Sequence, residues 1–373
     1  MTILWLSWKD IRHPQAGGAE RVGHEWRRRL QQDGHEVRHV TARYPSSPAR
    51  EHLEGIETIR CGTSALGHYP AALAYLARHT DWPDVVIEEV NTVPYGSRIV
   101  RSRARTVLLY FQLAREIWFH QTAWPVAVTG YAAEAVYTRL QALGHPPVIT
   151  ISEDSRRDLA TMGFAAERVH VAAVGIDNTP LTAYEPAPKT ASFTVLFHSS
   201  LRAMKRPRHA LEAFHIFASD GSAGQLWMAG GGSDAALRRD ARRYGIDERV
   251  TFFGRTSEAQ KLDLMQRATV LVATSVKEGW GLIVTEANSM GTPAVVYDVD
   301  GLRAAAGTHN WIAPPDPAGL AARLRDAARV FAERPQYDGW CARVLQDSRG
   351  RTHDASYAEF RRALTASLDS PHG

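Results

Sequence analysis

Short apolar runs alternate with longer segments of helical spacing along most of this chain. Residues 3–7 and 270–274 are apolar runs of strand length bounded by polar or glycine-containing segments, which predicts buried strands. Residues 20–32 carry apolar and polar side chains before Gly34 and are predicted to form a helix. The repeated order of strand, helix and strand indicates an α/β protein with parallel sheets.

The first half of the chain is predicted to form one doubly wound α/β domain over residues 1–180. Its expected strands lie at 3–7, 36–41, 84–88, 106–111 and 148–152, and its expected helices at 20–32, 69–79 and 124–143. A linker-like composition follows at 177–190, with Asn178, Pro180, Pro186 and Pro188. We therefore expect the first domain to end there.

The same pattern restarts in a second Rossmann-like domain, predicted over residues 190–350. Its expected strands lie at 193–198, 225–229, 250–253, 270–274 and 294–299, and its expected helices at 207–218, 235–244 and 282–290. The length agrees with two domains, because single cores rarely grow beyond about 250 to 300 residues. This chain has 373 residues, of which 44% are hydrophobic.

The net charge of +4 is mild, but its source is uneven. Only five of the 44 basic residues are lysines, which we attribute to codon composition rather than nucleic-acid binding, and which makes each lysine more informative. Three successive arginines, Arg27, Arg28 and Arg29, form the candidate patch for loose contact with anionic lipid, although a solvated helix face is the simpler interpretation. We expect no nucleic-acid partner.

The two cysteines, Cys61 and Cys341, fall in different predicted domains and match no metal or redox spacing. We therefore expect both to be reduced. Residues 2–8 are apolar but too short for a secretory core, and no stretch reaches the length of a membrane span. The sequence thus predicts a cytoplasmic protein with at most peripheral membrane contact.

Two glutamates, Glu278 and Glu286, are the main candidates for chemistry. Seven residues separate them, and Gly279 and Gly281 lie in between. On one continuous helix two such side chains would diverge by about 80°, so we expect Glu278 on a loop and Glu286 on the following helix, which ends at Gly291. Ligands of parallel sheets bind beyond the strand carboxyl ends, and a carboxylate there can accept hydrogen bonds from a diol. The alternative is a solvated surface loop.

Two glycine-rich segments add to this picture. Gly17 and Gly18 follow the first strand, so two domains facing each other across a cleft would set this loop opposite the Glu278 loop. The triplet at residues 230–232 suggests a dinucleotide-binding oxidoreductase as a competing function. It lacks the third spaced glycine of that fingerprint, so we give this alternative little weight.

With these motifs in order, the chain resembles the retaining GT-B glycosyltransferases of group 1 (family 4) over nearly its whole length. The markers are Ala16-Gly-Gly-Ala-Glu20, Gly34-His-Glu-Val37, Ala173-Val-Gly-Ile-Asp177, Lys205 before Arg206 and Pro207, Phe253-Gly-Arg255, and residues 278–293. The resemblance implies two Rossmann-like domains, with a C-terminal segment at 355–373 that returns to the first domain and contains a helix at 355–368. It also implies transfer of a sugar from a nucleotide donor to an acceptor.

The family roles pass to matching positions only. The resemblance implies that Lys205 contacts the donor diphosphate, that Glu286 holds the ribose, that Glu278 lies near the sugar, and that Arg255 lies at the base. Backbone contacts to phosphate and sugar are implied for Gly17, Gly18, Gly279, Trp280, Gly281, Leu282 and Ile283. We take Lys205 and Glu278 as the catalytic candidates and expect no bound metal, with the leaving phosphate oxygen accepting the acceptor's proton. The alternatives are a sugar-nucleotide epimerase of the same architecture and a non-catalytic nucleotide-sugar binder.

The chain departs from the family pattern at two places. Relatives carry Gly-Arg-Leu before the lysine, but this chain has Ser199-Ser200-Leu201, so Arg202 or Arg206 is expected to replace the phosphate arginine near Ser200. Histidines expected before an Arg-Glu pair are replaced by Gln112 and Ala114. We expect an altered acceptor pocket for a natural product, lipid-linked saccharide or glycan. Its candidate lining is Gln112, Arg115, Glu116 and Trp118, and an Arg115–Glu116 salt bridge is the alternative.

Overall fold

A computed structural model describes residues 1–62 and 67–369 of the chain. It divides into two compact units, which we treat separately. Unit 1 comprises Met1–Trp118, Trp124–Gly175 and the C-terminal segment from His353, and unit 2 comprises Phe119–Ala123 and Ile176–Thr352. The chain therefore returns to unit 1 after completing unit 2.

Unit 1 is built on a sheet with the strand order β3-β4-β2-β1-β5-β6-β7-β8. All neighbouring strands are parallel except β3 and β4. The strands are β1 (Thr2–Leu6), β2 (Glu36–Ala42), β3 (Arg50–Leu53), β4 (Ile56–Cys61), β5 (Val85–Val90), β6 (Arg105–Tyr110), β7 (Val148–Thr150) and β8 (Val169–Val171). The helices are α1 (Gly18–Gln32), α2 (His68–Arg78), α4 (Trp124–Ala142), α5 (Glu153–Thr161) and α13 (His353–Asp369).

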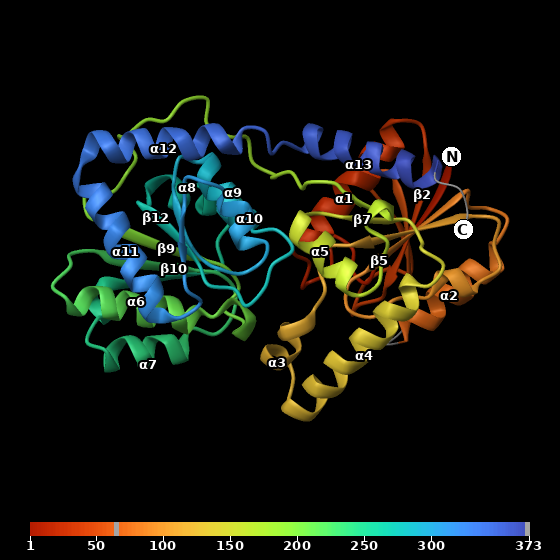
Figure 1. Cartoon of the computed structure of the whole chain (residues 1–373), viewed down its shortest axis with the longest axis horizontal. Coiled ribbons are helices and arrows are strands. Elements are labelled where there is room, and N and C mark those ends of the chain that lie inside the picture. The colour runs from red at the N-terminus through yellow and green to blue at the C-terminus, as the bar shows by residue number, and fades with distance from the viewer. Residues whose placement is uncertain (63–66, 370–373) are drawn as a thin grey trace. The chain divides into compact units, whose positions relative to one another are not determined.

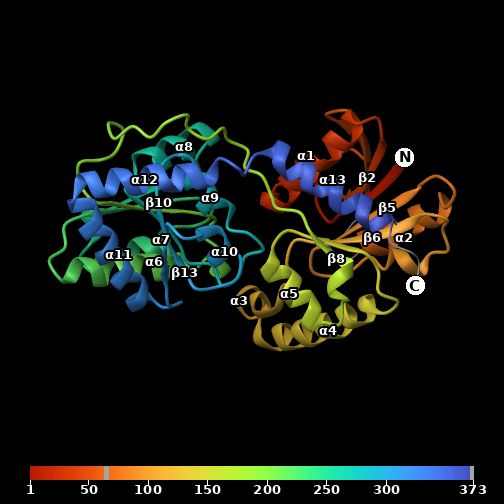
Figure 2. The ribbon, with the colours of Figure 1, turned by 45° about the horizontal axis from the view of Figure 1, so that its top comes forward.

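The C-terminal helix α13 packs beside α1 in unit 1 (Figure 2). Trp26 of α1 stacks on Phe360 of α13 with ring centroids 4.4 Å apart, and on Phe111 at 6.1 Å. The indole nitrogen of Trp26 donates to Ser356 Oγ at 3.0 Å. Aromatic burial and one satisfied donor thus fix the end of the chain on the unit in which it began.

Unit 2 carries an all-parallel sheet with the strand order β11-β10-β9-β12-β13-β14, and α6 and α11 lie side by side against it (Figure 1). The strands are β9 (Thr194–His198), β10 (Gln225–Ala229), β11 (Val250–Gly254), β12 (Val270–Ala273), β13 (Ala294–Tyr297) and β14 (Trp311–Ala313). The helices are α6 (Pro207–Ser219), α7 (Ala235–Arg243), α8 (Glu258–Arg267), α9 (Leu282–Ser289), α10 (Leu302–Ala306), α11 (Pro317–Ala332) and α12 (Arg334–Ser348); the short α3 (Trp118–Gln121) crosses from unit 1.

Each predicted strand and helix is found within about two residues of its expected ends. Several other elements were not predicted, namely β8, β14, α3, α5, α8, α10, α11 and α12. The antiparallel pair β3 and β4 was missed because its alternating polar residues resemble a loop. The arginine patch at 27–29 is wrong as predicted, because Arg27 is only 1% exposed, while Arg28 and Arg29 form ion pairs with Glu25. Within the described ranges, no helix is both long and apolar enough to cross a bilayer.

Candidate functional site

The two predicted catalytic residues, Lys205 and Glu278, meet at the carboxyl edge of the sheet in unit 2. Lys205 ends the short 3₁₀ turn Ala203–Lys205 before α6, and Glu278 follows β12. The ammonium group of Lys205 forms an ion pair with Glu278 Oε1, which also accepts a 2.6 Å hydrogen bond from Ser275 Oγ. The two side chains keep 18% and 17% of their surface exposed, so a ligand can reach both.

The turn that carries Glu278 is supported by the loop after β13. Gly301 has φ = +75°, and a Cβ there would lie 2.1 Å from the carbonyl oxygen of Glu278. The Gly281 amide donates to the Gly301 carbonyl at 3.1 Å. A glycine is therefore required at 301 for backbone angle and space. Sequence reasoning missed Gly301, although the Asp300-Gly301 pair after a predicted strand is a turn signal.

The start of α9 offers backbone donors beside this ion pair. The amides of Gly281 and Leu282 are engaged, with the carbonyls of Gly301 and Trp280. Those of Gly279, Trp280 and Ile283 have no hydrogen-bond partner among the described residues. Free amides at a helix start attract negatively charged oxygens. The predicted backbone contacts therefore narrow to three of the five positions from 279 to 283.

Glu286 lies deeper, on the second turn of α9, and it has a partner that the sequence did not predict. Lys261 of α8 places its Nζ atom 3.0 Å from Glu286 Oε1, and each side chain is only 5% exposed. The same Nζ atom is 2.6 Å from Glu258 Oε2. A buried carboxylate is stabilised by a nearby cation, so the ion pair with Lys261 fixes the orientation of Glu286. The scarcity of lysines in this chain was the one available signal for Lys261.

The glycine triplet at 230–232 packs against the segment that holds Ser200. Gly230 has φ = +142°, and a Cβ there would lie 1.7 Å from the Ser199 carbonyl oxygen. The Leu201 amide donates to the Gly231 carbonyl at 2.9 Å. The triplet therefore serves close packing of two neighbouring loops, which accounts for its glycines without a dinucleotide. Arg202 lies beside Ser200 and donates from Nε to its Oγ at 3.1 Å.

Two further side chains, those of Arg255 and His198, lie at the same edge of the sheet in unit 2. The position of a Cβ on Gly231 would be 3.4 Å from Arg255 Nε, so the Arg255 guanidinium covers that glycine. His198, at the end of β9, contacts Thr256 Oγ1 at 2.9 Å. Burial and the nearby Lys261 charge lower the pKa of His198 to about 4. His198 is therefore a neutral hydrogen-bonding group near pH 7, and no sequence motif indicated it.

In unit 1, the glycine pair lies at the start of α1, which begins at Gly18 rather than at the predicted residue 20. Gly17 is the residue before the helix, and its amide donates to the Glu20 carboxylate at 2.6 Å. This capping arrangement uses the Gly17 donor inside the protein. Of the two predicted glycines, Gly18 is the one whose amide can face a ligand at the helix start.

The predicted acceptor residues divide into two groups. The guanidinium of Arg115 lies 4.1 Å from the centre of the Tyr131 ring and donates to its hydroxyl at 2.6 Å, and Trp118 packs on Gly130 of α4. Among the described residues, Arg115 and Glu116 form no ion pair with each other, and the Arg115 guanidinium bonds to Tyr131 instead. Glu116 is exposed.

The Oε1 atom of Gln112 is buried without a hydrogen-bond partner among the described residues, as is the Nη1 atom of Arg115. An unpaired buried acceptor is costly, typically about 1 to 3 kcal/mol. Gln112 and Glu116 thus remain as groups that can meet a ligand, whereas Arg115 and Trp118 hold α4.

Comparison with known families gives two matches that together cover most of the chain. The family described as "Glycosyltransferase Family 4" matches residues 16–179, and "Glycosyl transferases group 1" matches residues 184–330. Each match falls on one repeat of the strand and helix pattern. The catalytic candidates Lys205 and Glu278 lie in the second match.

Curated relatives include D-inositol 3-phosphate glycosyltransferases. The protein of Mycolicibacterium paratuberculosis is 28% identical over 294 residues, which are 68% of this chain and 64% of that protein. The protein of Nocardia farcinica is 25% identical over 259 residues, which are 57% of each chain. The chain thus spans less than two thirds of the length of these relatives.

Solved structures share the fold over almost the whole chain. Sucrose-phosphate synthase from Thermosynechococcus elongatus has a TM-score of 0.76 and 20% identity, with 98% of each chain covered. Anabaena Alr3699/HepE in complex with UDP-glucose has a TM-score of 0.72 and 16% identity, with 98% of this chain and 100% of that chain covered. These likenesses establish the GT-B fold, with two Rossmann-like α/β domains.

Proposed function

Because this chain belongs to the group 1 glycosyltransferases, as its two family matches show, we propose that it transfers a sugar from a nucleotide-sugar donor to an acceptor. The observation that carries the proposal is the ion pair of Lys205 and Glu278 beside the free amides at the start of α9. It joins a cation, a carboxylate and neutral donors at one accessible edge of unit 2. A sugar diphosphate needs this combination.

Lys205 and the amides stabilise the departing diphosphate. As the bond between the sugar C1 and the phosphate oxygen breaks, negative charge grows on that oxygen, and fixed donors nearby lower the barrier. Glu278, now paired with Lys205, is released to the sugar hydroxyls when the diphosphate takes over the ammonium group. One preorganised donor of this kind contributes about 2.7 to 4 kcal/mol at the transition state.

We propose a retaining course without a metal ion. The acceptor oxygen attacks C1 from the face that the diphosphate leaves, and the leaving phosphate oxygen takes the acceptor's proton. The new bond to C1 then has the configuration of the donor. This course needs no separate protein base, and the charge of Lys205 serves where a metal ion would otherwise neutralise the diphosphate.

We propose Arg202, rather than Arg206, as the substitute for the phosphate arginine at position 200. Arg202 already donates to Ser200 Oγ at 3.1 Å, whereas Arg206 adopts a left-handed φ of 48° and lies 5.9 Å from the Tyr297 ring centre. Arg202→Ala should weaken donor binding, and adding Ser200→Arg should restore it. Equal affinity of wild type and Arg202→Ala would rule this assignment out.

The first test is thermal unfolding with a panel of UDP, GDP, dTDP and ADP sugars, with and without a chelator. UDP-glucose heads the panel, because the structurally similar HepE is seen with it. A ligand that binds only the folded state raises the unfolding temperature with its concentration. We expect one nucleotide class to do so, chelator to make no difference, and Glu286→Ala to abolish the shift.

Product analysis then separates transfer from its alternatives. Release of nucleoside diphosphate with a glycosylated product of unchanged anomeric configuration is the expected result. Conversion of the nucleotide sugar without release of diphosphate would indicate an epimerase. Binding without turnover, across an acceptor panel of natural products, lipid-linked saccharides and glycans, would indicate a non-catalytic binder.

A further inference from the structure

The helix α4 in unit 1 exposes apolar side chains and buries polar ones, which is the reverse of an ordinary surface helix. Six of the ten exposed large hydrophobic side chains in the described chain lie on α4 or directly after it, including Trp124 at 73% and Leu143 at 64% exposure. Those six are Trp124, Val126, Val128, Val136, Leu140 and Leu143, and we call them the α4 apolar face. Surface helices of globular proteins place polar residues there instead.

The opposite side of α4 is polar and buried. Four of its five buried residues follow helical spacing along one face, and three of these four are polar: Glu134, Thr138 and Gln141, with Ala127 as the fourth. The Glu134 carboxylate accepts the amides of Ala114 and Arg115, each at 2.6 Å. Gln141 Nε2 donates to Glu88 Oε1 at 3.2 Å. These polar contacts fix the rotation of the helix, so the outward position of its apolar residues is set by specific bonds.

An arginine-rich segment borders the last turn of α4. The Arg98 guanidinium donates to the carbonyls of Gln141 and Leu143, each at 2.8 Å, and so ties residues 97–105 to the helix end. This segment has four arginines and no acidic residue, and its Ile99 is 78% exposed. On the exposed side of α4 itself, the single charged residue is Arg139. Apolar side chains and cations are therefore adjacent.

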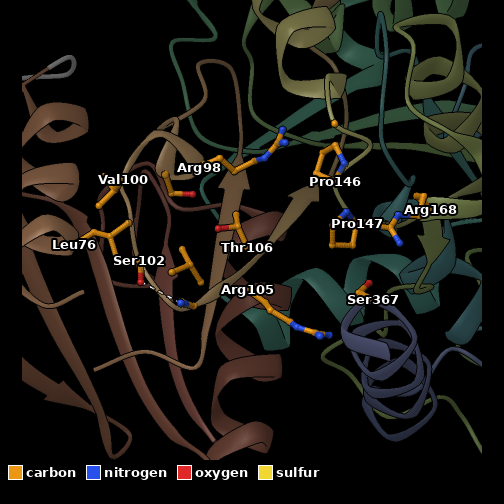
Figure 3. A pocket seen from close by; sticks show the side chains of 14 residues that line it. Leu76, Arg98, Val100, Ser102, Arg105, Thr106, Pro146, Pro147, Arg168 and Ser367 are labelled. Carbon is orange, nitrogen blue, oxygen red and sulfur yellow. Dashed lines mark hydrogen bonds between the residues drawn. The ribbon is translucent and has the colours of Figure 1, made fainter. Parts of the chain in front are cut away.

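A pocket of about 240 Å³ opens beside this border (Figure 3). Arg98, Arg105 and Arg168 line it, together with Ser102 and other small or apolar residues, and no described lining residue is acidic. Figure 3 shows the arginines spread along the pocket wall, with Ser367 of α13 beside Arg168. Arg98 and Arg168 also donate to backbone carbonyls, but all three guanidinium groups keep their positive charge beside a lining without acidic residues, which favours a phosphate.

We propose that the α4 apolar face and residues 97–105 dock on an anionic phospholipid bilayer, with the arginine pocket receiving a headgroup phosphate. Apolar side chains on one helix face enter the interface, and nearby arginines attract anionic lipid. A self-contact about a two-fold axis would bring two arginine-rich segments together, which like-charge repulsion opposes. The docking surface does not depend on the transfer reaction, and it replaces the arginine patch expected at 27–29.

The test is co-sedimentation of the full chain with vesicles of phosphatidylcholine, alone or with about one third phosphatidylglycerol. We expect binding to the anionic vesicles only, weakened by added salt. Val136→Gln with Leu140→Gln should weaken it about tenfold or more, by removing buried methylene groups. Arg101→Glu with Arg103→Glu should weaken it about 25-fold or more, since each surface arginine contributes about fivefold.

Matched variants separate docking from unfolding and from bulk charge. Val136→Leu with Leu140→Ile keeps the face apolar and should bind like wild type. Arg239→Glu with Arg242→Glu changes the charge equally on exposed positions of α7 and should also bind like wild type. Circular dichroism and thermal unfolding check that every variant is folded.

Three outcomes would overturn the proposal. The first is that the wild-type protein does not co-sediment with anionic vesicles at low salt. The second is that both disruptive variants bind as the wild type does. The third is a concentration-dependent dimer in sedimentation velocity that Val136→Gln with Leu140→Gln abolishes, which would make this face an interface between two copies of the chain.

Discussion

Lys205 is the residue on which turnover should depend most strongly. Its ammonium group is positioned by Glu278 and stays accessible, so Lys205→Ala removes one charge-stabilising donor without opening the core. We expect turnover to fall about a hundredfold or more, from the contribution of one such donor. Lys205→Arg keeps the positive charge and should retain a larger share of activity. Initial rates of nucleoside diphosphate release measure both, and near-normal rates in Lys205→Ala would refute the assignment.

Lys261 and Glu286 should behave as one energetic unit. Lys261→Met removes the cation that pairs with the buried Glu286 carboxylate. We therefore expect the free energy of unfolding to fall by about 3 kcal/mol. The double variant with Glu286→Gln should lose clearly less than the sum of the two single changes. Urea unfolding of all four proteins gives the coupling. Strict additivity would show that the two side chains act independently.

His198 should make part of the stability dependent on pH. Its pKa is lowered to about 4 in the folded protein from 6.5, because burial and Lys261 disfavour the charged ring. The unfolded chain then binds the proton first as pH falls. The stabilising contribution is complete above the unfolded pKa and is lost through the window from 6.5 down to about 4.

The variant that isolates this term is His198→Asn, which cannot titrate. Between about pH 7.5 and about pH 5 we expect the wild type to lose up to about 2 kcal/mol more stability than the variant. Denaturant unfolding at both pH values measures the difference. Parallel losses in the two proteins would show that His198 titrates normally in the folded state.

At the scale of elements, the turn before α9 depends on a loop from the next strand. Gly301→Ala would push a Cβ to 2.1 Å from the Glu278 carbonyl at a positive φ, so the Glu278 turn must shift. We expect donor affinity to fall about tenfold to a hundredfold, because misplacing a binding group by about 1 Å can cost that much. Donor affinity by calorimetry is the measurement.

The control is Gly245→Ala, where φ is +66° and no atom lies within 4 Å of the added Cβ. It carries the same backbone penalty of about 1 to 2 kcal/mol without crowding the turn. Donor affinity should be unchanged in this variant. If both variants weaken the donor equally, general destabilisation rather than the Glu278 turn would explain the effect.

The elements also show what local patterns can and cannot predict. Most strands of both sheets were predictable because buried parallel strands are short apolar runs. The pair β3 and β4 was not, since its residues alternate between polar and apolar at the sheet edge. The strands β8 and β14 were not predicted either, because each has three residues and is too short to show a pattern. The helix α4 was predicted at nearly its observed bounds, but its periodicity could not tell which face is buried. Glu134 and Gln141 decide that through partners distant in sequence.

At the scale of the whole chain, unit 1 should depend on the C-terminal helix. Phe360 is fully buried between Trp26 and Trp5, with ring centroids 4.4 Å and 5.9 Å away. Phe360→Ala should cost about 3 to 5 kcal/mol of unfolding free energy. Thr365→Ala, on the exposed side of α13, should change it by less than about 0.5 kcal/mol. Near-UV circular dichroism during denaturation follows the tryptophans, and equal stability of the two variants would contradict the role of α13.

The sequence by itself determined the alternation of strands and helices, the presence of two Rossmann-like domains, and the candidate residues Lys205, Glu278 and Glu286. The alternation of elements and the glutamate pair follow from hydrophobic periodicity and from glycines at turns, which are local properties of the chain, whereas Lys205 was indicated by the family resemblance. Only the tertiary structure decided that Lys261 partners Glu286, that Gly301 supports the Glu278 turn, and that α4 turns its apolar side outward. Those features depend on contacts between segments far apart in sequence, and no local pattern specifies which segments meet.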